Sequence, residues 1–260
     1  MIPASKGMRT AVAIAATVTA TMTMTALLVG VAVAPVSALA SAFASASPNE
    51  PAKPTPPRDI LGEWLNHQGA VRTWTAAFVQ TRSLKTLTQP LKSEGRVWFA
   101  APDRFRWEIG RPAQTIAVRQ VDSVIVHYPR LNRAERYPAD AGGTGPWAQM
   151  LSLLEAGFPR GRADLDKRFT LVSESSTNGL VTLELRPRSA SVRRMLPTFR
   201  VVLFEADASL RATELVFADG SSLRNEFSET QTNPVLPDGT FEVVLDPDVK
   251  VTEPLSPKTR

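Results

Sequence analysis

The sequence of 260 residues contains no cysteine and only two histidines. Without cysteine the chain has no disulfide framework, no thiolate-ligated zinc, no iron–sulfur cluster and no thiol nucleophile. His67 and His127 stand apart, with no H-x-x-x-H or related metal-binding spacing around them. The sequence also lacks a G-x-S-x-G nucleophile elbow and a P-loop. We therefore expect a non-enzymatic protein with no catalytic residue, no metal and no cofactor.

An excess of charge of one sign is also missing. The 30 Lys and Arg against 25 Asp and Glu give a net charge of +5, and the two signs are interspersed. This excludes the basic stripe by which proteins follow a phosphate backbone, so we expect no nucleic-acid partner. Around Arg193 and Arg194, with three further arginines nearby, the sequence is locally basic. This cluster indicates either a solvated face or a contact with an anionic membrane surface or an acidic partner.

One long uncharged run stands near the N-terminus. It follows Lys6 and Arg9, spans residues 11–34, and precedes small-residue cleavage patterns at 38–40 and 42–44. This is the layout of a secretory signal peptide. We assign residues 1–40 to the signal, with cleavage near 40–46, and expect export across the inner membrane. The alternative is an uncleaved signal anchor, because the run approaches transmembrane length.

Proline, with 21 residues, is abundant and unevenly placed. Five prolines in residues 48–57 predict an extended, semi-rigid linker over residues 41–57, followed by one domain over residues 58–260. Further along, prolines 90, 102, 112, 129 and 138 punctuate the chain at intervals that suit short strands joined by turns.

The mature chain is predicted to be mainly β. Helical spacing predicts one short helix over Arg58–Gln68, and a period-two pattern begins at Thr73. Asn178-Gly179 and Asp219-Gly220 are strong hairpin signals. About ten or eleven strands are too many for a flat sheet, so we expect a curved antiparallel sheet. The further predicted strands are Arg96–Ala100, Arg104–Ile109, Gln114–Arg119, Val124–Tyr128, Arg168–Glu174, Leu180–Arg186, Phe199–Glu205, Ala212–Ala218, Ser222–Glu229 and Phe241–Leu245.

A second helix is predicted between strands, after the glycine-rich residues 142–145. Trp147, Met150, Leu151 and Leu154 fall at i, i+3, i+4 and i+7, which makes one apolar face. The pattern suits an ordinary core-packing helix, or a mobile plug over the mouth of the curved sheet. Because the strands carry more aromatic residues than one helix covers, an internal cavity for an apolar ligand is expected.

Several motifs resemble the LolA family of periplasmic carriers for outer-membrane lipoproteins. The most specific is the G-x-x-W-F-x-x-P-x-x-F-R-W pattern of residues 95–107, and the resemblance spans about residues 58–252. It is carried by Phe78-Val79-Gln80, residues 95–108, residues 112–116, residues 126–129, residues 215–220, Asn233, Leu236, residues 241–243 and residues 247–251.

The resemblance implies an incomplete, half-open antiparallel β-barrel of about eleven strands, with short α-helices forming a lid over a hydrophobic cavity. It further implies a periplasmic monomer that holds acylated lipoprotein or lipid cargo, with an inner-membrane release complex and an outer-membrane acceptor as partners. The candidate residues of the cavity and lid are Phe78, Trp98, Phe105, Trp107, Ile116, Val118, Tyr128, Trp147, Met150, Leu151 and Leu154.

One position departs from the family. The resemblance implies an arginine before the strand-connecting proline that hydrogen-bonds the lid, but here Ala101 precedes Pro102. Arg104 and Arg106 are candidates to replace it. The alternatives to a housekeeping carrier are a divergent paralogue serving lipid or pigment export, a periplasmic sensor or regulatory protein with the same fold, and a small-molecule enzyme using the cavity as a pocket.

Overall fold

A computed structural model describes residues 58–138 and 159–254. The expected signal peptide, the expected linker and the helix predicted over Trp147–Leu154 lie outside the described residues.

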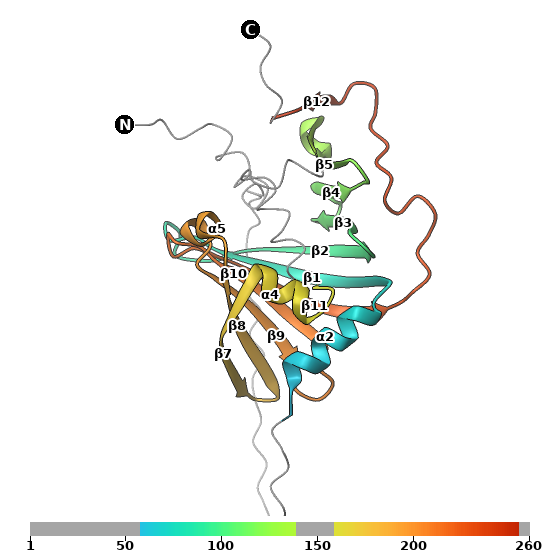
Figure 1. The fold of residues 1–260 in the computed structure, drawn as a ribbon. Coiled ribbons are helices and arrows are strands. Elements are labelled where there is room, and N and C mark those ends of the chain that lie inside the picture. The colour runs from blue at the N-terminus through green and yellow to red at the C-terminus, as the bar shows by residue number, and fades with distance from the viewer. Residues whose placement is uncertain (1–57, 139–158, 255–260) are drawn as a thin grey trace, which may run out of the picture. The chain divides into compact units, whose positions relative to one another are not determined.

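The described residues form a single twelve-stranded sheet (Figure 1). Its strands are β1 (Thr73–Ser83), β2 (Leu91–Ala100), β3 (Arg104–Ile109), β4 (Thr115–Arg119), β5 (Ser123–Tyr128), β6 (Arg133–Pro138), β7 (Phe169–Thr177), β8 (Leu180–Pro187), β9 (Thr198–Phe204), β10 (Leu210–Val216), β11 (Ser222–Thr232) and β12 (Lys250–Thr252).

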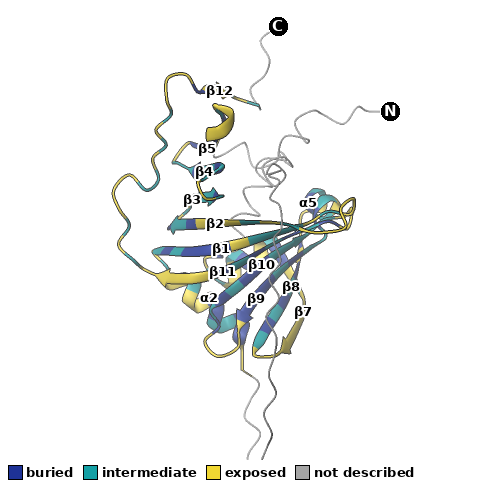
Figure 2. Cartoon of the chain, turned by 180° about the vertical axis from the view of Figure 1, so that it is seen from behind, coloured by how far each residue is buried: buried dark blue, intermediate teal, exposed yellow. Residues whose placement is uncertain are grey.

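The strand order is β12-β6-β5-β4-β3-β2-β1-β11-β10-β9-β8-β7, so β12 and β7 are the two edges and the sheet is not closed into a barrel. All neighbours are antiparallel except β12 and β6, which run parallel. The expectation of an open, mainly antiparallel β fold is confirmed. β7 is largely exposed beyond Leu171, as Figure 2 shows from behind.

The first helix is close to its predicted position. α2 (Ile60–Ala70) begins two residues later than expected, because the Asp59 side chain caps it by accepting a 2.8 Å hydrogen bond from the Gly62 amide. Its apolar face, including the fully buried Trp64, joins the main hydrophobic core. Apolar residues at helical spacing thus place one face of this helix against the sheet.

Strand register assigns every side chain of the sheet to one of two faces. Phe78 pairs with Gly95, and Val97 pairs with Trp107, so these residues share a face. Side chains of that face form one core cluster with residues of α2, of α4 (Arg162–Arg168) and of α5 (Ala190–Met195). We call it the helix-covered face, and the other the opposite face.

The opposite face of β3–β6 is covered by residues 234–249, which we call the C-terminal strap. Val243, Leu245 and Val249 pack on Ile125 and Ala134. Arg106 donates to the carbonyl oxygens of two strap residues, at 3.4 and 3.1 Å. The strap leads into β12, which pairs with the edge strand β6.

The predicted strand Phe241–Leu245 is therefore wrong as a strand, although its alternation is real. Residues 241, 243 and 245 are half-buried and residues 242 and 244 are exposed, but the segment has no sheet partner among the described residues. Alternating side chains indicate that one side of an extended segment is buried. A segment that packs on the face of a sheet shows this pattern just as a strand paired within the sheet does.

Besides the short 3-10 helix η1 (Pro129–Leu131), four elements escaped the sequence patterns: β6, β12, α4 and α5. In β6 the helix-covered face carries Arg133, Glu135 and Tyr137, so apolar and polar residues do not alternate. The other three are only three to seven residues long. Segments this short show less than two helical turns or a few strand positions, which leaves no period to detect.

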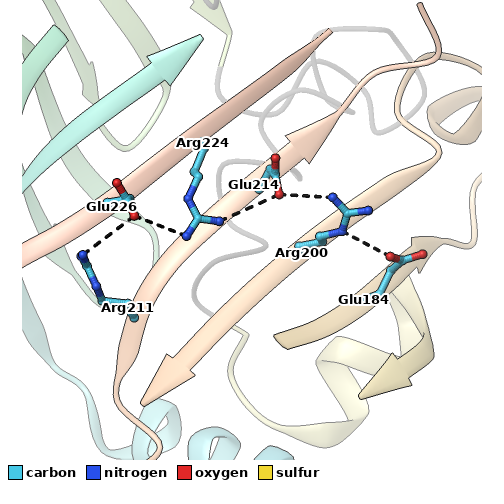
Figure 3. A network of polar contacts seen from close by, with 6 residues as sticks. All are labelled: Glu184, Arg200, Arg211, Glu214, Arg224 and Glu226. Carbon is cyan, nitrogen blue, oxygen red and sulfur yellow. Dashed lines mark hydrogen bonds and ion pairs between the residues drawn. The ribbon is translucent and has the colours of Figure 1, made fainter. Parts of the chain in front are cut away.

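A charged ladder crosses the opposite face of β8–β11 (Figure 3). Arg200 of β9 bridges Glu184 of β8 at 3.2 Å and Glu214 of β10 at 3.3 Å. Arg224 of β11 continues the chain from Glu214, at 4.0 Å, to Glu226, at 3.4 Å. Burial opposes the charge of Arg200, but its hydrogen bonds to the two glutamates outweigh this and raise its pKa. Arg211 completes the ladder by pairing with Glu226 at 3.8 Å, so three arginines and three glutamates keep this part of the face polar and neutral.

Candidate apolar binding face

An aromatic cluster forms the centre of the helix-covered face. Phe78 of β1 packs on Trp107 of β3, with ring centroids 4.6 Å apart. Phe227 of β11 contacts Trp74 edge-on at 5.3 Å and Trp107 at 6.3 Å. The two contacts of Phe227 have the edge-on geometry that aromatic rings favour. Three strands thus present one continuous aromatic surface.

The apolar surface continues along the sheet towards β5. Phe105 and Ile109 flank Trp107 on β3, and Val124 and Val126 follow on β5. All four are buried, whereas Trp107 is only half-buried. Side chains of this face therefore provide an unbroken apolar strip from β11 to β5.

The strip ends at a buried carboxylate on β6. Glu135 is 5% exposed and accepts hydrogen bonds from the hydroxyls of Tyr137, at 2.7 Å, and Tyr128, at 3.5 Å. Arg133 forms an ion pair with it at 3.3 Å and lies over the Tyr128 ring. Burial, followed by the nearby carboxylate, raises the pKa of Tyr128 to about 12. Burial and the hydrogen bond to Glu135 also raise the pKa of Tyr137.

A pocket opens at the C-terminal end of β2, next to Ala101. Its volume is about 390 Å³, and it lies between the end of α2, the β2–β3 turn and residues 159–160. Phe99 belongs both to this pocket and to the helix-covered face, so the pocket adjoins the apolar strip. It is lined by Gln68, Gly69, Val71, Phe99, Ala101, Pro102, Pro159 and Arg160.

The structure divides the seven predicted cavity residues that it describes. Phe78, Phe105, Trp107 and Tyr128 lie on the helix-covered face, as pairs from β1 to β5 require. Trp98, Ile116 and Val118 lie on the opposite face, because Trp98 pairs with Arg106, and Arg106 with Val118. The structure does not bring these three together with the aromatic cluster, so they do not belong to the candidate face. The four predicted lid residues lie outside the described residues.

Two aromatic members of the cluster were not predicted. Trp74 lies four residues before Phe78 on the same strand, so strand parity alone could have identified it. Phe227 could not have been found this way. Its place depends on β1 pairing with β11, more than 140 residues further along the chain.

Neither arginine proposed to replace the lid contact faces the helices. Arg106 binds the C-terminal strap, and Arg104 lies over the strap residue Phe241, 5.0 Å from the ring centroid. A different arginine reaches the β2–β3 turn: Arg160 donates a 3.1 Å hydrogen bond to the carbonyl oxygen of Pro102. The turn next to Ala101 is thus contacted by an arginine from the segment preceding α4.

Neither a metal-ligand cluster nor a membrane-spanning helix occurs among the described residues. Residues 58–138 and 159–254 contain no group of three or more histidine, aspartate or glutamate side chains placed to hold a metal ion. In the same part of the chain, no helix is long and apolar enough to cross a membrane.

The fold and this face define a single-sheet β protein whose apolar face is covered by helices. Residues 69–244 match the family model of the outer membrane lipoprotein carrier protein LolA, and the chain belongs to this family. The family comprises carriers rather than enzymes, which confirms the expectation of a non-enzymatic protein.

The chain is similar to two curated outer-membrane lipoprotein carrier proteins. It is 29% identical to that of Dechloromonas aromatica, over 68% of this chain and 85% of the relative. It is 30% identical to that of Bordetella avium, over 70% of this chain and 82% of the relative. A LolA superfamily protein from Nitrosomonas europaea aligns with 69% of this chain and 96% of its own at 11% identity, with a TM-score of 0.36.

Proposed function

We propose that this protein is a periplasmic carrier that binds acyl chains of lipoproteins on its helix-covered face and moves them from the inner to the outer membrane. The observation that carries the proposal is the aromatic cluster of Trp74, Phe78, Trp107 and Phe227, continued as an apolar strip to β5. In this proposal residues 1–40 direct export, residues 41–57 are a linker and residues 58–260 are the carrier domain.

The energetics suit a saturated chain as ligand. Each methylene buried against such a strip contributes about 0.8 kcal/mol, without any catalytic group. Trp107 and Phe99 of this face are half-buried, and Phe99 reaches the pocket beside Pro102. We propose this end of the strip as the place where an acyl chain meets the face.

The partners follow from the same proposal. A monomer would receive its cargo from an inner-membrane release complex and deliver it to an outer-membrane acceptor. Similarity to proteins called outer-membrane lipoprotein carriers supports this direction of transfer.

The test is release of radiolabelled lipoproteins from spheroplasts. Adding the purified protein should move labelled lipoproteins into the supernatant, and native mass spectrometry should find acylated cargo bound. Absence of release, together with no acylated molecule bound to the native protein, would contradict the proposal. A heat-denatured sample of the same protein serves as the control for release by added protein alone.

A further inference from the structure

Three loops meet at one end of the sheet and gather basic side chains there. α5 lies beside the β1–β2 and β10–β11 turns in both views (Figures 1 and 2). The Ala218 amide donates to the Met195 carbonyl oxygen at 2.9 Å, and Ser83 pairs with Ser222. We call this region the basic tip. We assign to it seven basic residues and the aspartate of the β10–β11 turn: Arg82, Lys85, Lys92, Arg186, Arg188, Arg193, Arg194 and Asp219.

The net positive charge of the tip exceeds the net charge of the whole chain. Seven basic residues and one aspartate give it a net charge of +6, against +5 for all 260 residues, so the remainder sums to −1. The neighbouring α4 adds little, because Arg162 pairs with Asp166 and Arg168 with Asp164. Positive charge is thus concentrated at one end of the protein.

Among the described residues, no ion pair within 4 Å neutralises a charge of the tip. Arg193 donates to the carbonyl oxygens of Pro187 and Arg188, which fixes the guanidinium but leaves its charge. Within the described ranges, Lys85, Lys92 and Arg194 are exposed and form no ion pair with a carboxylate. Asp219 accepts hydrogen bonds from the hydroxyl and amide of Ser221, which lower the pKa of its carboxyl and keep it ionised.

An exposed apolar side chain stands among these charges. Leu87, in the β1–β2 turn two residues after Lys85, is 45% exposed. Basic residues around an exposed leucine match the boundary between phosphate headgroups and acyl chains. There the basic side chains contact the phosphates and the leucine side chain contacts the acyl chains. The 390 Å³ pocket lies at the opposite end of β2 and takes no part in the tip.

From these observations we propose that the basic tip docks the protein reversibly on an anionic phospholipid surface, with Leu87 entering the headgroup region. A fluid anionic surface attracts a protein through charge density rather than through a complementary groove, and the tip provides that charge density. Binding depends on ionic strength because salt screens the attraction between the basic residues and the lipid headgroups. It is weak because neither this attraction nor the insertion of one leucine is as strong as a membrane anchor. This inference is independent of cargo binding on the helix-covered face.

Vesicle co-sedimentation tests the proposal, with protein purified from the periplasmic fraction of expressing cells. At 0.1 M salt the protein should sediment with phosphatidylcholine vesicles containing phosphatidylglycerol but not with pure phosphatidylcholine vesicles. At 1 M salt, where the Debye length falls to ~3 Å, binding should be lost. Equal binding to both vesicle types, or none, would overturn the proposal.

Charge-matched variants locate the surface. The triple variant Lys85→Gln, Lys92→Gln and Arg194→Gln should lower vesicle affinity on the order of 100-fold, at about fivefold per basic residue. The control, Arg72→Gln, Arg136→Gln and Lys250→Gln, removes the same charge from exposed positions elsewhere and should bind like the unchanged protein. Equal loss in both triples would mean that net charge alone acts, and would overturn the assignment to the tip.

Further measurements test the role of Leu87 and distinguish a lipid surface from an acidic protein partner. Leu87→Ser should lower affinity roughly fivefold by removing the inserted side chain. An acidic protein as partner predicts instead that the tip triple leaves vesicle binding intact and weakens binding to soluble polyglutamate, which would overturn the lipid assignment. Lipoprotein release by the tip triple, assayed at saturating protein, reports separately on the proposed carrier function.

Discussion

Phe78 lies directly across from Gly95, and its ring occupies the space that a side chain at position 95 would need. A Cβ built on Gly95 would also collide with the carbonyl oxygen of Glu108. The glycine of the family-like G-x-x-W-F motif is therefore explained by the aromatic cluster. It allows the Phe78 ring to lie over β2 and reach Trp107.

Gly95→Ala should destabilise the fold by about 1–3 kcal/mol, because neither the ring nor the carbonyl can move without disturbing the cluster. Urea unfolding followed by tryptophan fluorescence measures the change. Gly69→Ala is the matched control, since nothing lies within 4 Å of a Cβ there and alanine favours the helix. Equal stability of the Gly95→Ala variant and the unchanged protein would contradict this account.

Trp107→Glu should abolish binding of acylated cargo, because a carboxylate would interrupt the aromatic cluster of the helix-covered face. Trp98→Glu makes the same change one strand away on the opposite face and should retain binding. Circular dichroism verifies that both variants fold, and native mass spectrometry counts bound acyl chains. The reverse result, with loss only in Trp98→Glu, would show that cargo binds the opposite face.

Both tyrosines of the chain should resist ionisation at alkaline pH. Tyr128 and Tyr137 are the only two, both hydrogen-bond Glu135, and the pKa of Tyr128 is raised to about 12. Tyrosinate absorbance at 295 nm should therefore stay low at pH 10 to 11 in the folded protein. In guanidinium chloride the same residues should titrate with a pKa of about 10. Titration of the folded protein near its unfolded midpoint would refute the arrangement.

The same shift gives the sign of a stability change with pH. Above pH ~10 the unfolded chain loses tyrosine protons that the folded chain keeps, so the free energy of unfolding should decline as pH rises towards about 12. Tyr128→Phe should reduce this decline, as measured by urea unfolding at pH 9 and pH 11. A variant with an undiminished decline would assign the effect to other groups.

Removing the centre of the charged ladder should cost little, and less at high salt. Glu214→Gln weakens contacts to Arg200 and Arg224, and because these side chains are partly exposed we expect a loss of about 0.5–1 kcal/mol. The loss should shrink in 1 M NaCl, as urea unfolding at two salt concentrations will measure. Glu229→Gln, which breaks the exposed pair with Arg96, should change stability by less. An effect that does not respond to salt would argue against ionic pairing.

The sequence determined much of this protein by itself. Alternating side chains placed β3 without error and β5 and β8 to within one residue, because a half-buried strand must alternate. The G-x-x-W-F-x-x-P-x-x-F-R-W motif identified the family. Helical spacing identified the buried face of α2, including Trp64.

Tertiary structure decided which residues share a face. Parity groups residues within a strand, but register joins one strand to the next, and a shift of one residue exchanges the faces. Phe78 and Trp107 therefore meet, while Trp98 lies behind them, only because β2 pairs as it does. Contacts between distant segments, which no local pattern encodes, decide three further features. These are the pairing of β1 with β11, the strap over β3–β6 and the basic tip.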